Sequence, residues 1–91
     1  MKPTDQLTAL TALNEFESLG GGRYLLQVRS GVPVGEALDS ASCRLSEVIE
    51  FLREQSVDEQ GLSQNSLYLV WFLVENVKAV VDAANLGVLR L

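Results

Sequence analysis

Residues 67–74 read LYLVWFLV, an unbroken apolar run inside a segment that otherwise has the pattern of a helix. Successive helical residues are about 100° apart, so a run of this length covers every side of the helix. A chain of 91 residues with two good helices cannot bury such a segment on all sides by itself. We therefore expect a second copy of the chain to cover the remainder, which predicts a homodimer.

Length and composition predict one small domain of the globular class, because 47% of the residues are hydrophobic. The net charge of −5 disfavours binding to the phosphate backbone of nucleic acids. The single cysteine excludes an internal disulfide and fits a reducing compartment. No signal peptide is evident, and the apolar run is shorter than the about 20 residues of a membrane span. We expect a cytoplasmic protein with neither membrane nor nucleic-acid partners.

The N-terminal residues 1–22 are interpreted as a flexible tail, disordered or weakly helical, that ends in three consecutive glycines. The following residues, 23–29, have the alternating pattern of a short strand. No second strand is evident in the chain. The strand either pairs with its equivalent in a second subunit or lies against the helices as an extended arm.

Residues 23–91 are predicted to form the folded domain, an antiparallel helical hairpin preceded by the strand. The first helix should cover residues 33–55, because Pro33 suits the first helical position and one apolar seam follows it. A polar connection over residues 56–64 then leads to a second helix over residues 63–86. Ser63 or Ser66 can cap this helix, and Gly87 is placed to end it in a left-handed conformation.

The second helix has two apolar seams, which is what a four-helix bundle made from two hairpins requires. We assign the first seam to packing on the first helix; it consists of Leu67, Val70, Val74, Val77, Val81 and Ala84. We assign the second seam to the dimer interface; it consists of Phe72, Asn76, Ala79 and Ala83. The predicted fold is therefore mainly α, with two hairpins dimerising into a four-helix bundle.

The sequence contains no constellation of catalytic or metal-binding residues that we recognise. It has no histidine, which removes the commonest general base and the commonest metal ligand. Cys43 falls on the polar side of the first helix, and the acidic set Glu47, Glu50 and Glu54 has the pattern of a solvated helix face. Residues 20–22 precede a strand and lack the lysine of a phosphate-binding loop. We expect no enzyme activity and no cofactor.

The roles of Trp71 and Asn76 each have two interpretations. Trp71 either anchors an interface or covers the core, since aromatic residues do both. Asn76 either fixes the register of a helix–helix contact or faces solvent at the edge of the bundle. Tyr68 and Trp71 together form a possible face for a partner or ligand.

Four stretches of the sequence carry a resemblance: residues 24–33 and 36–43, and further on residues 68–70 and 77–83. The most specific portion is Gly-Val-Pro followed by Glu-Ala-Leu, at positions 31–38. These stretches resemble a family of small bacterial domains of unknown function. The resemblance spans roughly residues 22–85. It implies domain boundaries and a bacterial cytoplasmic origin, and it supplies no activity or catalytic residues.

These observations lead to a non-enzymatic, homodimeric interaction protein as the first hypothesis. The alternative is a module that binds a small ligand or the helix of another, unidentified protein with the apolar face around Trp71 and Phe72. A stable dimer with Phe72 buried favours the first hypothesis, and a monomer with an exposed apolar patch favours the second.

Overall fold

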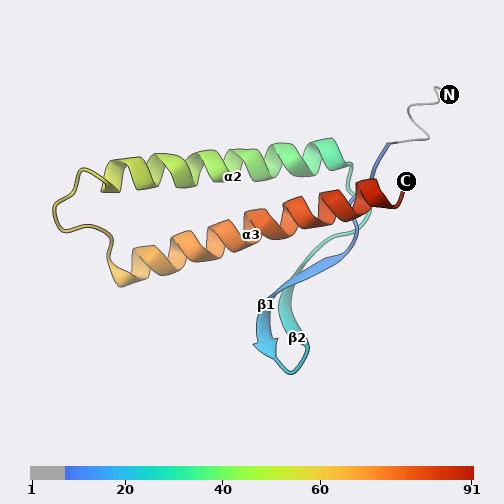
Figure 1. Cartoon of the computed structure of the whole chain (residues 1–91), viewed down its shortest axis with the longest axis horizontal. Coiled ribbons are helices and arrows are strands. Elements are labelled where there is room, and N and C mark those ends of the chain that lie inside the picture. Colours follow the sequence, from blue (N-terminus) through green and yellow to red (C-terminus); the bar gives the residue numbers. More distant parts are fainter. Residues whose placement is uncertain (1–7) are drawn as a thin grey trace.

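A computed structural model describes residues 8–91 as a β-hairpin followed by two long antiparallel helices (Figure 1). Strands β1 (Asn14–Gly20) and β2 (Arg23–Val28) form the hairpin. Helices α2 (Val34–Gln55) and α3 (Gln64–Leu89) lie side by side. The predicted helical hairpin is confirmed, whereas the strand before it has a partner that the sequence interpretation missed.

The partner of β2 is β1, which lies within the segment that we interpreted as a tail. The two strands pair antiparallel, with Phe16 opposite Leu26 and Ser18 opposite Tyr24. Gly21 and Gly22 connect them, both with positive φ, as a tight type I′ hairpin turn requires. The prediction of a disordered or weakly helical tail is therefore wrong for residues 14–20. Residues 1–7 of that tail lie outside the described residues.

Backbone pairing continues past the hairpin and fixes the start of α2. The Thr11 amide donates to the Val32 carbonyl at 2.7 Å, and the Val34 amide donates to the Ala9 carbonyl at 2.9 Å. The buried Thr11 hydroxyl donates to the Arg29 carbonyl at 2.7 Å and accepts from the Val32 amide at 3.1 Å. These bonds pair the backbone groups and the hydroxyl of the buried Thr11, which would otherwise lose their hydrogen bonds to water without replacement.

The ends of the helices follow the sequence prediction in three places out of four. Helix α2 begins directly after Pro33 and ends at Gln55. Helix α3 begins after Ser63, whose hydroxyl accepts from the Ser66 amide at 3.1 Å. The predicted end at Gly87 is wrong, because α3 continues through Gly87 to Leu89. A Cβ atom at Gly87 would overlap the Leu10 carbonyl, so this glycine permits a close crossing of two backbones.

The N-terminal segment, residues 9–14, crosses α3 on the side that we assigned to a second subunit. The Ala12 amide donates to the Ala83 carbonyl at 3.0 Å, and the Asn14 side-chain amide donates to the Ala79 carbonyl at 2.9 Å. Ala79 and Ala83 are buried, and Ala83 completely so. Small residues let the crossing chain approach the helix backbone closely. The same chain, and not a second copy, covers this part of α3 in the structure.

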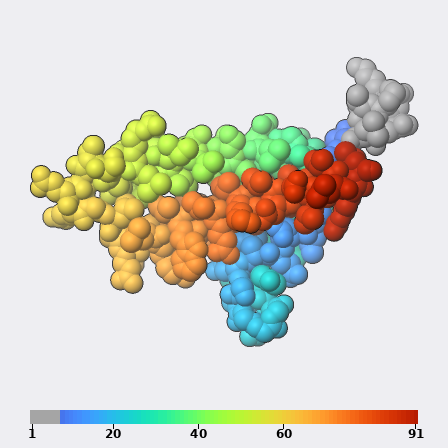
Figure 2. Space-filling view, viewed as in Figure 1, coloured from blue at the N-terminus to red at the C-terminus, as the bar shows by residue number. Residues whose placement is uncertain are grey.

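The hydrophobic core is small and lies where α2, α3 and the end of β2 meet. It consists of Ala37, Ala41, Val77 and Val80, with Val28 and Val32 packed against it. The molecule measures 56 × 35 × 15 Å along its principal axes, so the helices form a single layer. Figure 2 shows α3 as the middle band of this layer, with α2 on one side and the hairpin on the other. Most stable domains pack two layers around their core.

Candidate functional site

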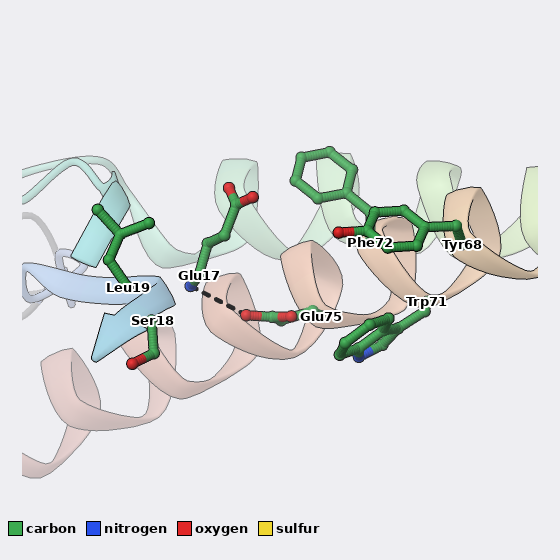
Figure 3. Close-up of a pocket in the computed structure, with 7 residues that line it drawn as sticks. All are labelled: Glu17, Ser18, Leu19, Tyr68, Trp71, Phe72 and Glu75. Carbon is green, nitrogen blue, oxygen red and sulfur yellow. Dashed lines mark hydrogen bonds between the residues drawn. The ribbon is translucent and has the colours of Figure 1, made fainter. Parts of the chain in front are cut away.

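A cleft of about 390 Å³ lies between the tip of β1 and the first half of α3 (Figure 3). One wall comes from α3 and the other from the end of β1. The cleft is lined by Glu17, Ser18, Leu19, Tyr68, Trp71, Phe72 and Glu75. We call this region the aromatic cleft.

The wall formed by α3 results from helical spacing. Tyr68 precedes Trp71 and Phe72 by three and four residues, and Glu75 follows them by four and three, which brings the four side chains to one side of the helix. The Tyr68 and Trp71 rings meet edge to face, with centroids 5.6 Å apart and planes at 70°. Their side chains are 66% and 63% exposed, which is high for such large apolar rings.

The tip of β1, which forms the other wall, is bonded to α3 through the backbone of Glu17. The Glu17 amide donates to Oε1 of Glu75 at 2.9 Å, the bond drawn in Figure 3. Glu17 has φ of 60°, a left-handed conformation that is uncommon for residues other than glycine. The bond to Glu75 supports this conformation. Neither carboxylate has an ion pair within residues 8–91.

The structure places the residues predicted as functional in three locations. Tyr68, Trp71 and Phe72 are brought together in the aromatic cleft, with Phe72 half-buried. Asn76 lies outside it and accepts a hydrogen bond from Arg44 of α2 at 3.0 Å. The remaining two, Ala79 and Ala83, lie under the N-terminal segment, so the predicted dimer interface is largely occupied by contacts within the chain.

Sequence reasoning missed the contribution of β1 to the cleft. Glu75 was not among the predicted site residues, and Glu17 was placed in the tail. The usable signal was the pair of glycines at positions 21 and 22, which favours a hairpin turn between two strands.

A second exposed surface runs along both helices. Large apolar side chains repeat every seven residues on each helix, and each is between 39 and 52% exposed. On α2 they are Leu38, Leu45 and Leu52, with Ile49 beside them, and on α3 they are Leu67, Val74, Val81 and Val88. We call this surface the heptad face. We had assigned Leu67, Val74 and Val81 to packing on the first helix, and the structure leaves them exposed.

Both stripes of the heptad face lie on the same side of the molecule. Arg44 of α2 and Asn76 of α3 are joined across one broad side of the helical layer. By helical geometry the stripe lies about 80–120° around α2 from Arg44 and about 120–180° around α3 from Asn76, in both cases beyond the buried positions between the helices. The two stripes therefore share the opposite broad side.

The described residues contain no cluster suited to a metal ion. Within residues 8–91, no group of three or more Asp, Glu, Cys or His side chains could hold one. Cys43 is exposed, as are Glu47, Glu50 and Glu54. Neither of the two helices in the described part of the chain is long and apolar enough to cross a membrane.

Comparison with known proteins identifies the family of the chain. No curated protein and no solved structure gives a significant match. A family model does match, over residues 11–87, and it is described as "Protein of unknown function (DUF3077)". The matched range begins at Thr11, whose amide donates to the Val32 carbonyl, and ends at Gly87. The chain therefore belongs to this family of proteins of unknown function.

Proposed function

We propose that this protein is a non-enzymatic, homodimeric interaction protein, and that its two copies meet through the heptad face. The observation that carries the proposal is a strict seven-residue repeat of exposed apolar side chains on both helices of a single-layer molecule. Such a repeat keeps its residues on one seam of a helix, which is the pattern of helices that pack on other helices.

The shape of the chain supports a second layer. A compact monomer of 9.9 kDa has about 5,200 Å² of accessible surface by the usual scaling with mass. This chain has 6799 Å².

A second copy fits this surface because the face is nearly flat and is built from two antiparallel helices. Rotation about a two-fold axis places the same face of a second hairpin against the first, and a four-helix bundle results. The aliphatic side chains of the heptad face would then form a second core on the side of the helical layer opposite Arg44 and Asn76.

The test compares one substitution in the heptad face with a matched one outside it. Val74→Glu places a charge in the proposed interface, whereas Val57→Glu adds the same charge to the 84% exposed turn between the helices. Sedimentation equilibrium at micromolar concentration should give twice 9.9 kDa for the wild type and for Val57→Glu. Val74→Glu should sediment as a monomer with unchanged helical circular dichroism, since Val74 is already half exposed in the single chain.

Two results would contradict the proposal. A wild-type mass of 9.9 kDa would exclude the dimer. A dimer that Val74→Glu leaves intact would place the interface on another surface.

A further inference from the structure

We propose that the aromatic cleft binds a basic segment of a partner protein, with an arginine or lysine side chain inserted between the rings of α3 and Glu17. This inference concerns a different surface from the heptad face and does not depend on dimerisation. It rests on three observations: the chemistry of the cleft walls, the lack of an ion pair for Glu17 and Glu75 within residues 8–91, and the open shape of the cleft.

The rings supply one part of the recognition. A guanidinium or ammonium group within about 6 Å of an aromatic centroid is attracted by the negative ring face. Trp71 and Tyr68 meet edge to face at 70°, so a cation would lie over the face of one ring at a time. Both rings are largely exposed, so a cation can reach them without displacing any described part of the chain.

The carboxylates supply the second part. Glu17 and Glu75 both line the cleft, and no basic residue does. Glu75 uses Oε1 to accept from the Glu17 amide, which leaves its other oxygen without a hydrogen bond in residues 8–91. In Figure 3 the Glu17 side chain extends from β1 on the side of Phe72, and the Trp71 ring lies on the other side of Glu75. An incoming guanidinium would meet two negative groups beside the aromatic faces, the combination that favours arginine.

Three basic residues of the described chain interact with side chains outside the cleft. Lys78 pairs with Asp82 at 2.7 Å, and Arg53 lies 4.0 Å from Glu50. Arg44 donates to Asn76. With a net charge of −5, the whole chain also attracts a basic partner from a distance.

The openness of the cleft favours a protein segment over a small molecule. Small-ligand sites bury about 70–90% of the ligand surface, whereas here the two largest rings remain mostly in solvent. Leu19 lines the cleft beside the carboxylates and can contact the methylene groups of a long basic side chain. A peptide can gain further contacts along the surface that a free amino acid cannot.

The experiment uses the full chain and its only tryptophan, Trp71, as a local reporter. Titration with a hexa-arginine peptide should change the Trp71 emission in a saturable way. Glu17→Gln should raise the peptide Kd by about fivefold, the effect of one well-formed exposed ion pair. The fold should survive this change, because the Glu17 carboxylate makes no hydrogen bond within residues 8–91.

The matched control is Glu47→Gln, which makes the same change in net charge on an exposed position of α2 outside the cleft. It should change the Kd by less than about twofold, since Glu47 is exposed and does not line the cleft, and solvent and salt weaken its attraction for the peptide. Tyr68→Leu is a second cleft variant that removes a ring and no charge, and it should also weaken binding.

Three outcomes would overturn the proposal. The first is the absence of a saturable change in Trp71 emission. The second is equal weakening by Glu17→Gln and Glu47→Gln, which would mean a general attraction between peptide and acidic chain. The third is binding of free arginine as tightly as the peptide, which would make the cleft a small-molecule site.

Discussion

The two long sides of α3 differ in residue size and in what covers them. On one side, Ala79, Ala83 and Gly87 are buried beneath the N-terminal segment, whose backbone and Asn14 side chain donate to helix carbonyls. On the heptad face, larger residues such as Val74 and Val81 are about two-fifths exposed. Small residues mark a contact that the chain makes with itself at backbone distance. Large apolar residues mark a surface that the single chain leaves open.

The largest expected effect is on the covered side, at Ala83. Ala83→Glu would bury an unpaired charge at a completely buried position, which costs about 4 kcal/mol or more of unfolding free energy. The neighbouring Asp82→Ala removes only the exposed ion pair with Lys78, worth about 0.3–0.5 kcal/mol. Urea denaturation followed by circular dichroism measures both.

This pair of variants also separates two interpretations of Ala83. If Ala83 lay in a dimer interface, as the sequence suggested, Ala83→Glu would chiefly weaken association and leave a folded monomer. The structure instead predicts an unfolded or molten chain at every protein concentration. A well-folded Ala83→Glu monomer would show that the N-terminal segment does not cover this side.

The next largest effect on the free energy of unfolding is expected at Gly87, where two backbones cross. Gly87→Ala places a methyl group against the Leu10 carbonyl, so the crossing segment must move. We expect a loss of about 1–3 kcal/mol, typical of overpacking, although alanine is the better helix former.

Gly35→Ala is the matched control for Gly87→Ala. Gly35 also lies in a helix, and nothing is within 4 Å of the added Cβ atom. This change should stabilise the protein by up to about 1 kcal/mol through helix propensity. Similar stabilisation by both substitutions, measured by urea denaturation, would mean that Leu10 does not pack on Gly87.

The sequence was sufficient for the helices because their signals are local. Pro33 marks the start of α2, and the Ser63 hydroxyl accepts from the Ser66 amide at the start of α3. Each signal acts within one turn of its own helix, so no tertiary information was needed.

The sequence was insufficient for β1, because residues 14–20 contain few strongly β-forming residues. What holds β1 is pairing with β2 and hydrogen bonds to α3, including the bond from the Glu17 amide to Glu75. The aromatic cleft could not be predicted for the same reason: Glu17 and Glu75 are far apart in the sequence and meet only in the tertiary structure. Gly87 was misread for the related reason that a helix-ending glycine and a close-approach glycine look identical in sequence.

The smallest expected effect on the single chain is at Val81, and its neighbour Val80 provides the comparison. Val→Thr keeps the shape of the side chain and adds a hydroxyl group. At Val80, which is 8% exposed in the core, the hydroxyl must lose water, and the cost is about 1–3 kcal/mol at any protein concentration. At Val81, which is 42% exposed on the heptad face, the hydroxyl stays in water in the monomer, and the cost is a few tenths of a kcal/mol.

Dimerisation through the heptad face would bury Val81 and make the cost of Val81→Thr grow with protein concentration, because association stabilises the folded state by mass action. Urea denaturation of both variants over a hundredfold range of concentration measures this difference. A Val81→Thr cost that stays small and constant, with a wild-type midpoint that does not depend on concentration, would show that the heptad face remains uncovered in solution.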